Sequence, residues 1–207
     1  MRVAIIGTGR IAENLGKALL AAGHFVAFGS RSPDKQNPFH QRVGLDTRIY
    51  GLEGAITAGE VVILAVPYSQ VAVVATRHAQ ILRSKVVVDL TNPIGSQPAD
   101  GRAGAEITAA AIGPGARVVA AFKDNFAATF LSPLAPDGTP RQVHLAGDDA
   151  EAKSAVAGLA TSIGFVPVDC GPLHSAVALD HLVPLLIEMD RRLNAGRADS
   201  IWKFVGG

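Results

Sequence analysis

The chain has 207 residues, and its 19 basic and 18 acidic side chains give a formal net charge of +1. Hydrophobic residues make up 48% of the sequence and charged residues 18%, which is typical of a well-packed globular protein and excludes a disordered or fibrous one. The basic residues gather in no stripe, so the charge pattern does not favour binding to nucleic acid.

The N-terminus and the apolar runs bear on location. The chain leads directly into an apolar strand, without the charged region and cleavage site of a signal peptide. No apolar run approaches the roughly 18 residues of a membrane helix. A single cysteine, Cys170, precludes an internal disulfide framework and suits a reducing compartment. We therefore expect a cytoplasmic protein that does not bind membranes.

Apolar periodicity and turn residues divide the chain into strands and helices. In chain order we predict a strand over residues 2–6, a helix over 10–22, a strand over 24–28, a short helix over 52–58, a strand over 60–66, a helix over 70–82, a strand over 85–89, a helix over 105–111, a strand over 117–122, a strand over 142–146, a helix over 148–163, a strand over 165–169 and a helical region over 173–193. Two prolines, Pro33 and Pro38, are expected to interrupt regular structure after the second strand.

The alternation over residues 1–122 predicts an α/β fold with a doubly wound parallel Rossmann sheet. The Gly- and Pro-rich stretch 92–104 is expected to form a loop over the site. The proline-rich stretch 132–141 is the candidate boundary. We therefore expect residues 1–130 to form an NADP-binding Rossmann domain and residues 131–207 to form a small C-terminal α/β part that covers the cofactor cleft.

A glycine-rich turn follows the first predicted strand and opens the first predicted helix. It reads Gly7-Thr8-Gly9-Arg10-Ile11-Ala12, a G-x-G-x-x-A fingerprint in the context that dinucleotide-binding sites require. The first glycine permits a tight turn, the second lets the backbone approach a pyrophosphate, and the small alanine allows close helix packing. The N–H groups at the helix start add the positive end of a dipole. The motif in this context favours dinucleotide binding over an ordinary glycine turn.

The end of the second predicted strand bears on which dinucleotide binds. NAD-preferring sites carry an Asp or Glu there, which accepts a hydrogen bond from the ribose 2′-hydroxyl. This chain has Ser30 and Arg31 at that place and Lys35 shortly after, and no acid at the strand tip. A guanidinium can pair with a 2′-phosphate, a hydroxyl can donate to it, and a lysine adds positive charge. These residues favour NADP, the alternative being a solvated polar loop.

Further candidates stand where later strands end, because ligands of such sheets lie outside the carboxyl ends of the strands. Val66 and Pro67 end one strand, and Asn92 and Pro93 follow the next. Their backbones could border the ribose and nicotinamide. The Asn92 amide could bind the cofactor or form an Asx turn before the proline, and the sequence leaves both open. Ala121 ends the last strand of the main sheet and should face the same crevice.

The sequence contains no obvious catalytic constellation, and the catalytic residues stay unknown. Lys123 could bind an anionic substrate or donate a proton, or it could pair with Asp124 or be solvated. Tyr68 and His174 are the other candidates for a proton donor, although His174 and His181 could also be surface or packing histidines. No cluster has the spacing of a metal site, and no G-x-S-x-G nucleophile elbow occurs.

Together these motifs resemble the NADPH-dependent deazaflavin reductases, the family of NADP oxidoreductases that use coenzyme F420. The likeness covers nearly the whole chain and rests on the segments Ile5-Ile6-Gly7-Thr8-Gly9, Phe28-Gly29-Ser30-Arg31, Leu64-Ala65-Val66-Pro67, Thr91-Asn92-Pro93, Ala121-Phe122, Ala146-Gly147-Asp148-Asp149-Ala150, Gly164-Phe165 and Asp169-Cys170-Gly171-Pro172-Leu173. The family often carries Asn directly after its Ala-Phe pair, where this chain has Lys123.

The resemblance implies a role for each part of the site. The cofactor pyrophosphate would lie over residues 8–11. The 2′-phosphate would lie near Ser30, Arg31 and Lys35. The nicotinamide would lie near Val66, Asn92 and Ala121. The resemblance also implies a small C-terminal part that leans over the cofactor, and commonly a homodimer.

We therefore expect an oxidoreductase that transfers a hydride between NADP(H) and a second redox molecule, with the deazaflavin coenzyme F420 as the leading candidate. Such a transfer needs few acids or bases, because the two cofactors carry the chemistry and the protein aligns them. The enzymatic alternative is an NADPH-dependent reductase of a small carbonyl, imine or metal chelate. An alternative of another class is a non-catalytic NADP(H)-sensing module.

Overall fold

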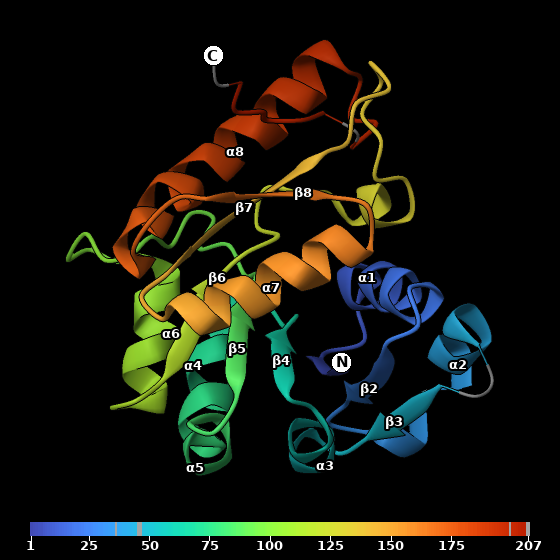
Figure 1. Cartoon of the computed structure of the whole chain (residues 1–207), viewed down its shortest axis with the longest axis vertical. Coiled ribbons are helices and arrows are strands. Elements are labelled where there is room, and N and C mark those ends of the chain that lie inside the picture. Colours follow the sequence, from blue (N-terminus) through green and yellow to red (C-terminus); the bar gives the residue numbers. More distant parts are fainter. Residues whose placement is uncertain (36, 45–46, 199, 206–207) are drawn as a thin grey trace.

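The computed structural model describes residues 1–35, 37–44, 47–198 and 200–205. Its strands form a sheet in the order β3-β2-β1-β4-β5-β6-β7-β8, with helices on both faces (Figure 1). The strands are β1 (Arg2–Ile6), β2 (Phe25–Gly29), β3 (Arg48–Tyr50), β4 (Val61–Leu64), β5 (Val86–Asp89), β6 (Arg117–Ala120), β7 (Gln142–Gly147) and β8 (Val166–Asp169). The α-helices are α1 (Arg10–Ala21), α2 (Asn37–Val43), α3 (Leu52–Ala58), α4 (Tyr68–Arg77), α5 (Ala79–Leu82), α6 (Gly104–Ile112), α7 (Ala150–Ser162) and α8 (Ala176–Leu193). The 3-10 helices are η1 (Pro33–Lys35), η2 (Ala127–Leu131) and η3 (Leu173–Ser175).

Strands β1 to β6 pair in parallel, which confirms the doubly wound α/β fold. The chain passes from β1 to β2 and β3 on one side of β1 and then crosses to β4 on the other side. The direction of winding therefore reverses between β1 and β4. Ligands of open α/β sheets bind at such a reversal, outside the carboxyl ends of the strands. The fold thus predicts a site beside the turn that follows β1.

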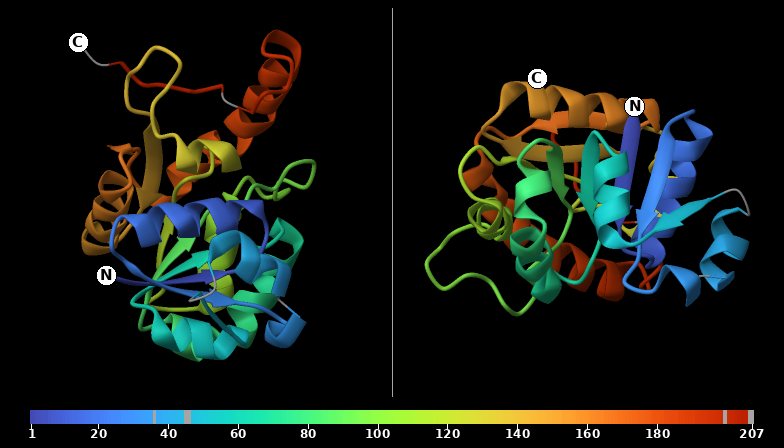
Figure 2. Two further views of the ribbon diagram at one scale, coloured as in Figure 1. Left: turned by 90° about the vertical axis from the view of Figure 1, so that its right-hand side faces the viewer. Right: turned by 90° about the horizontal axis from the view of Figure 1, so that it is seen from below.

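Both faces of the main sheet are buried, because successive side chains of a strand point to opposite sides. In β1, Val3 and Ile5 join the apolar layer that contains side chains of α1 and α7. Ala4 and Ile6 join the opposite layer, with side chains of α3, α4 and α6. Helices cover both faces of the sheet (Figure 2). This burial on two sides explains why the strands read as continuous apolar runs in the sequence and not as alternating ones.

The C-terminal residues extend the same sheet. β7 pairs antiparallel with the end of β6, where Val119 lies opposite Gly147 and Ala120 opposite Ala146. β8 then pairs in parallel with β7. α7 packs against β7 and β8 and also against β5 and β6 of the main sheet. α8 lies along the other side of β7 and β8 (Figure 1). The division into domains at residues 130 and 131 stays a prediction.

The stretch after β2 differs from the irregular structure that the sequence predicts. Helix α2 forms there with Pro38 in its first turn, where proline is tolerated because its missing N–H would have no partner in the helix. Phe39 anchors this helix against Phe28, with ring centroids 4.9 Å apart. β3 escapes sequence analysis because it is short and because Arg48 and Tyr50 are exposed.

Two further differences concern helices. The helix predicted over residues 70–82 is divided at His78 into α4 and α5. The short helix η2 was not predicted, because its five residues show no helical periodicity. Among the helices that lie in the described ranges, none is both long and apolar enough to cross a membrane.

One buried carboxylate holds the end of α8. Asp190 is 3% exposed and accepts hydrogen bonds from the Ser200 hydroxyl at 2.5 Å, the Ala198 N–H at 2.9 Å and the Asn194 amide at 3.1 Å. Burial by itself raises the pKa of Asp190, but these hydrogen bonds outweigh it and lower the pKa from 3.8 to about 2. The charged carboxylate therefore ties the C-terminal tail to the helix.

We expect Asp190→Asn to lower the free energy of unfolding at neutral pH by about 1–2 kcal/mol, because a carboxylate with a lowered pKa stabilises the folded state while it is charged. This stabilisation is complete above the unfolded pKa of 3.8 and is lost as the pH falls toward the folded value of about 2. Urea unfolding of both proteins across this pH range should show the difference shrinking with acid. A difference that does not change with pH would contradict the charge argument.

Candidate functional site

The turn between β1 and α1 is fixed by its close approach to the end of β4. Gly7 has a φ of +131°, a conformation that residues with a side chain rarely adopt. A Cβ atom at this position would lie 2.3 Å from the carbonyl oxygen of Ala65. The Gly7 N–H also donates to the carbonyl oxygen of Gly29 at 2.9 Å, which ties the turn to the end of β2. Packing therefore requires the first glycine of the motif.

Gly9 serves a different purpose in the same turn. A Cβ atom there would meet no atom within 4 Å, so this part of the backbone faces open space. Gly9 is the N-cap of α1 and has no side chain to cap the N–H groups of the first turn. Those groups lack partners within the helix and favour a negatively charged ligand. The second glycine thus leaves room for an anion above the start of α1.

A cavity of about 550 Å³ opens over this turn, and we call it the first cavity. Its lining residues are Gly7, Thr8, Gly9, Gly29, Ser30, Arg31, Ser32, Leu52, Ala65, Val66, Pro67, Ser69, Gln70 and Val74. They come from the ends of β1, β2 and β4, from the start of α3 and from the first two turns of α4. Arg31 is the one ionisable side chain among these described lining residues. The cavity therefore combines a glycine floor, several hydroxyl groups and one guanidinium.

The first cavity brings together about half of the cofactor-binding residues predicted from the sequence. Those that line it are Gly7, Thr8, Gly9, Ser30, Arg31, Val66 and Pro67. Those outside its lining are Arg10, Ile11, Lys35, Asn92, Pro93 and Ala121. Sequence analysis missed Leu52, Gln70 and Val74, because which face of α3 and α4 turns toward the cavity depends on how these helices pack. The binding role of every residue in these lists stays a prediction.

The tip of β2 keeps its basic character in the folded chain. Ser30 is 6% exposed, and its hydroxyl oxygen accepts a hydrogen bond from the Ser32 N–H at 3.1 Å. The Arg31 side chain is exposed beside it, at the rim of the first cavity. Lys35 is the last residue of the short helix η1, which follows the tip of β2. A guanidinium therefore stands where an acid would accept from a ribose hydroxyl.

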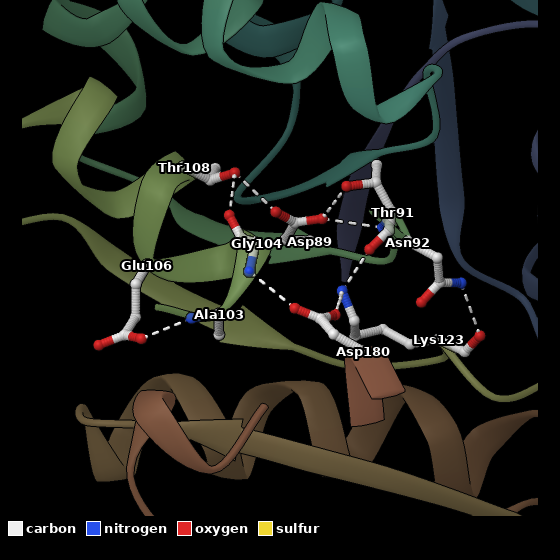
Figure 3. A network of polar contacts seen from close by, with 9 residues as sticks. All are labelled: Asp89, Thr91, Asn92, Ala103, Gly104, Glu106, Thr108, Lys123 and Asp180. Carbon is white, nitrogen blue, oxygen red and sulfur yellow. Dashed lines mark hydrogen bonds and ion pairs between the residues drawn. The ribbon is translucent and has the colours of Figure 1, made fainter. Parts of the chain in front are cut away.

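The carboxyl ends of β5 and β6 meet α8 in a buried polar network (Figure 3). Lys123 and Asp180 form an ion pair of 2.8 Å, and their side chains are 0% and 3% exposed. Lys123 also donates to the carbonyl oxygen of Thr91, and the second carboxylate oxygen of Asp180 accepts from the Gly104 N–H at 2.7 Å. Lys123 is therefore not solvated and does not pair with Asp124, and its ammonium group is not free to contact a substrate.

The backbone at Phe122 directs Lys123 into this network. Phe122 has a φ of +61°, which is unusual for a bulky residue and costs on the order of 1–3 kcal/mol. Its ring is 2% exposed and packs against Phe130, with ring centroids 5.9 Å apart. The apolar packing of this ring supports the unusual turn that ends β6.

The neighbours of Lys123 have partners of their own. The Asp124 carboxylate accepts from His144 Nδ1 at 2.7 Å, and both side chains are buried. The Asn92 Nδ2 donates to the carbonyl oxygen of Lys123 at 2.9 Å, and its Oδ1, which would accept in the Asx turn that the sequence left open, makes no such bond. Asn92 Oδ1 is buried and has no hydrogen-bond partner among the described residues. Asn92 therefore anchors the end of β5 to the end of β6.

The other two candidates for a proton donor lie in different surroundings. Tyr68 is half-buried at the start of α4, and burial raises the pKa of its phenol, as do the nearby charges of Asp180 and Asp89. His174 is 69% exposed and lies 3.1 Å from the Glu106 carboxylate. Tyr68 would therefore keep its proton at neutral pH and could donate a hydrogen bond.

Within the described ranges, no group of three or more His, Cys, Asp or Glu side chains could hold a metal ion.

The two glycines of the turn should respond differently to substitution. We expect Gly7→Ala to lower stability by roughly 2 kcal/mol or more, because the new Cβ atom meets the Ala65 carbonyl in a strained conformation. We expect Gly9→Ser to keep or raise stability, because serine can cap the free N–H groups of α1. The same hydroxyl would occupy the anion position, so dinucleotide affinity should fall about tenfold. Thermal unfolding and dinucleotide titration measure the two effects, and unchanged affinity in Gly9→Ser would contradict this account.

The buried ion pair leads to a second prediction. Lys123→Met or Asp180→Asn alone should lower the free energy of unfolding by about 3–5 kcal/mol, because each leaves an uncompensated buried charge. The double variant should recover most of this loss, since neither charge remains and the asparagine oxygen still accepts from Gly104. Urea unfolding of the four proteins gives the coupling energy. Additive losses would mean that the pair does not interact in solution.

Comparison with known proteins identifies relatives of the chain. A family model described as "NADP oxidoreductase coenzyme F420-dependent" matches residues 2–93. The chain is 30% identical to the F420-dependent NADP reductase of Methanothermobacter marburgensis, over 95% of this chain and 96% of that protein. It is 31% identical to the metalloreductase STEAP3 of Rattus norvegicus, over 84% of this chain and 35% of that protein. The chain thus spans about a third of the length of that metalloreductase.

The fold agrees over its whole length with a solved structure. The crystal structure of a putative F420-dependent NADP reductase from Arthrobacter sp. FB24 matches this chain with a TM-score of 0.87 and 26% sequence identity. The match covers 100% of both chains. The M. marburgensis relative adds 30% identity over nearly the full length of both proteins. The resemblance drawn from the sequence motifs is therefore confirmed, and the chain belongs to the family of coenzyme F420-dependent NADP oxidoreductases.

Proposed function

We propose that the first cavity binds NADP(H), with the pyrophosphate over the β1–α1 turn. The observation that carries this proposal is the combination of an open space above Gly9 with an exposed Arg31 at the tip of β2. The free N–H groups of α1 would hold the pyrophosphate, and the guanidinium would pair with the 2′-phosphate. Ser30 lines the cavity beside Arg31 and would contribute its hydroxyl group.

We further propose that the chain transfers a hydride between NADP(H) and a deazaflavin such as coenzyme F420. The described lining of the first cavity offers one ionisable side chain, and Lys123 is held in an ion pair. A direct hydride transfer suits this site, because the two redox molecules supply the reacting carbons. The protein's task is to hold the two rings about 3–3.5 Å apart and to exclude water. The family name and the F420-dependent relatives support this choice of acceptor.

A ferric chelate is the second candidate acceptor. The metalloreductase relative matches 84% of this chain at 31% identity, although the match covers about a third of that protein. Oxidation of one NADPH would reduce two ferric ions and release one proton, so this acceptor would need a carrier such as a flavin to divide the electron pair, and no proton donor in the first cavity. Carbonyl and imine reduction would depend on Tyr68 as its proton donor, because Lys123 is buried in an ion pair and His174 is exposed and paired. Tyr68 does not line the first cavity, so this reaction is less well supported.

We also propose that the chain forms a homodimer, as the resemblance implies. Leu185, Met189 and Leu193 follow one another at helical spacing on α8 and are 54%, 46% and 79% exposed. Trp202 and Phe204 in the C-terminal tail are 51% and 64% exposed. Exposed apolar residues that gather in one part of a molecule are typical of protein interfaces, which supports this proposal.

The acceptor can be identified by offering NADPH with coenzyme F420, a flavin, a quinone, a ferric chelate and small carbonyls in parallel assays. We expect F420 to be reduced in step with NADPH oxidation, and deuterium on the transferred position of NADPH should appear on the deazaflavin. Gly9→Ser serves as the control, since it should keep the fold and lose activity at low NADPH. Reduction of the ferric chelate alone would favour the second candidate. Tight NADPH binding with no acceptor reduced would support a sensing module and contradict the hydride-transfer proposal.

A further inference from the structure

A second cavity of about 420 Å³ adjoins the first at the tip of β2. Its lining residues are Ser30, Arg31, Gly51, Leu52, Glu53, Gly54, Arg77 and His78. Ser30, Arg31 and Leu52 line both cavities. The space around the Arg31 guanidinium therefore continues from the first cavity toward the end of α4.

Helix α4 runs beside both cavities. Gln70, Val74 and Arg77 stand at positions i, i+4 and i+7 and so share one face of this helix. Gln70 and Val74 line the first cavity, and Arg77 lines the second. A ligand that extends along this face from the first cavity would therefore reach Arg77.

The second cavity has two arginines with no ionic partner among the described residues. The side chains of Arg31 and Arg77 are exposed, and neither forms a hydrogen bond or an ion pair with any residue of the described ranges. Glu53 is the one acid in the lining and is also exposed. Two guanidinium groups and one carboxylate give the cavity wall a positive balance. Such a wall favours an anion with several acceptor oxygens, to which both guanidinium groups can donate.

A buried histidine provides an independent sign that this cavity takes a ligand. His78 lines the cavity and is 9% exposed, and its Nε2 is buried without a hydrogen-bond partner among the described residues. Burial lowers the pKa of His78, the Arg77 charge lowers it further, and Glu53 opposes these effects. Buried polar atoms in folded proteins are nearly always hydrogen-bonded, so an unsatisfied one beside a cavity points to a missing partner.

We propose that Arg77 is a second arginine for the 2′-phosphate of NADP(H), acting from α4 while Arg31 acts from the tip of β2. The inference rests on the proposed binding of NADP(H) in the first cavity. A 2′-phosphate carries three acceptor oxygens and up to two negative charges, whereas the ribose hydroxyl of NAD has a single oxygen and no charge. Arg77 therefore determines cofactor specificity from a helix that lies outside the sequence motif. Lys35 lines neither cavity, so Arg77 is the second cation among the lining residues of the two cavities.

The test compares NADPH and NADH affinities by fluorescence titration of the full chain and of Arg77→Gln. NADPH binding should weaken about 10- to 100-fold, and NADH binding should change less than about twofold, because hydrogen bonds to charged groups are lost only with the phosphate. Arg77→Lys should give an intermediate NADPH affinity, since it keeps the charge and loses the bidentate geometry. Arg197→Gln is the matched control. Arg197 is exposed beyond α8 and lines neither cavity, so this substitution removes the same charge away from both of them.

Arg31→Gln separates this inference from the proposed function on which it rests. If Arg31→Gln loses the preference for NADPH and Arg77→Gln keeps it, the role of Arg77 is wrong and NADP(H) binding stands. Equal weakening of NADPH and NADH in Arg77→Gln would also overturn it, because Arg77 would then act on the adenosine or on α4. If the unmodified chain binds neither nucleotide, the proposed function itself is wrong.

Discussion

The contact between the β1–α1 turn and the end of β4 is the constraint on which the site depends. The 2.3 Å that would separate a Gly7 Cβ from the Ala65 carbonyl oxygen leaves no room for any side chain. The start of α1, the end of β4 and the tip of β2 are thereby brought around one space at the reversal of the sheet. Without this approach, Gly9 and Arg31 would not line a common cavity.

A second constraint acts at the other end of the same sheet edge. The Lys123–Asp180 pair joins the end of β6 to α8, and Asp180 also holds the start of α6 through Gly104. Removing two charges from water is expensive, and a buried pair is tolerated only where further hydrogen bonds satisfy it. The carbonyl oxygen of Thr91 accepts one of these hydrogen bonds from Lys123. The pair therefore fixes where α8 crosses the strand ends more than it adds to stability.

The parts of the site that sequence analysis predicted are those encoded in neighbouring residues. The glycine turn could be read because its strand and helix flank it directly, and the buried strands because they are apolar on both faces. Asp180 and Arg77 could not be read in this way, since each acquires its neighbours only when a helix packs against strand ends distant in the chain. Lys123 shows the limit most plainly, because its partner is not the adjacent Asp124 but a residue on α8.

The arrangement of charges around the second cavity bears on how the cofactor would be chosen. Arg31 and Arg77 line one space, and like charges that share a site disfavour each other until a counter-charge enters. A dianionic phosphate would relieve that repulsion and gain two sets of hydrogen bonds, whereas a ribose hydroxyl would leave both guanidinium groups as they are. The two guanidinium groups would therefore contribute to the discrimination together, because only the phosphorylated cofactor would bring the negative charge that relieves their repulsion.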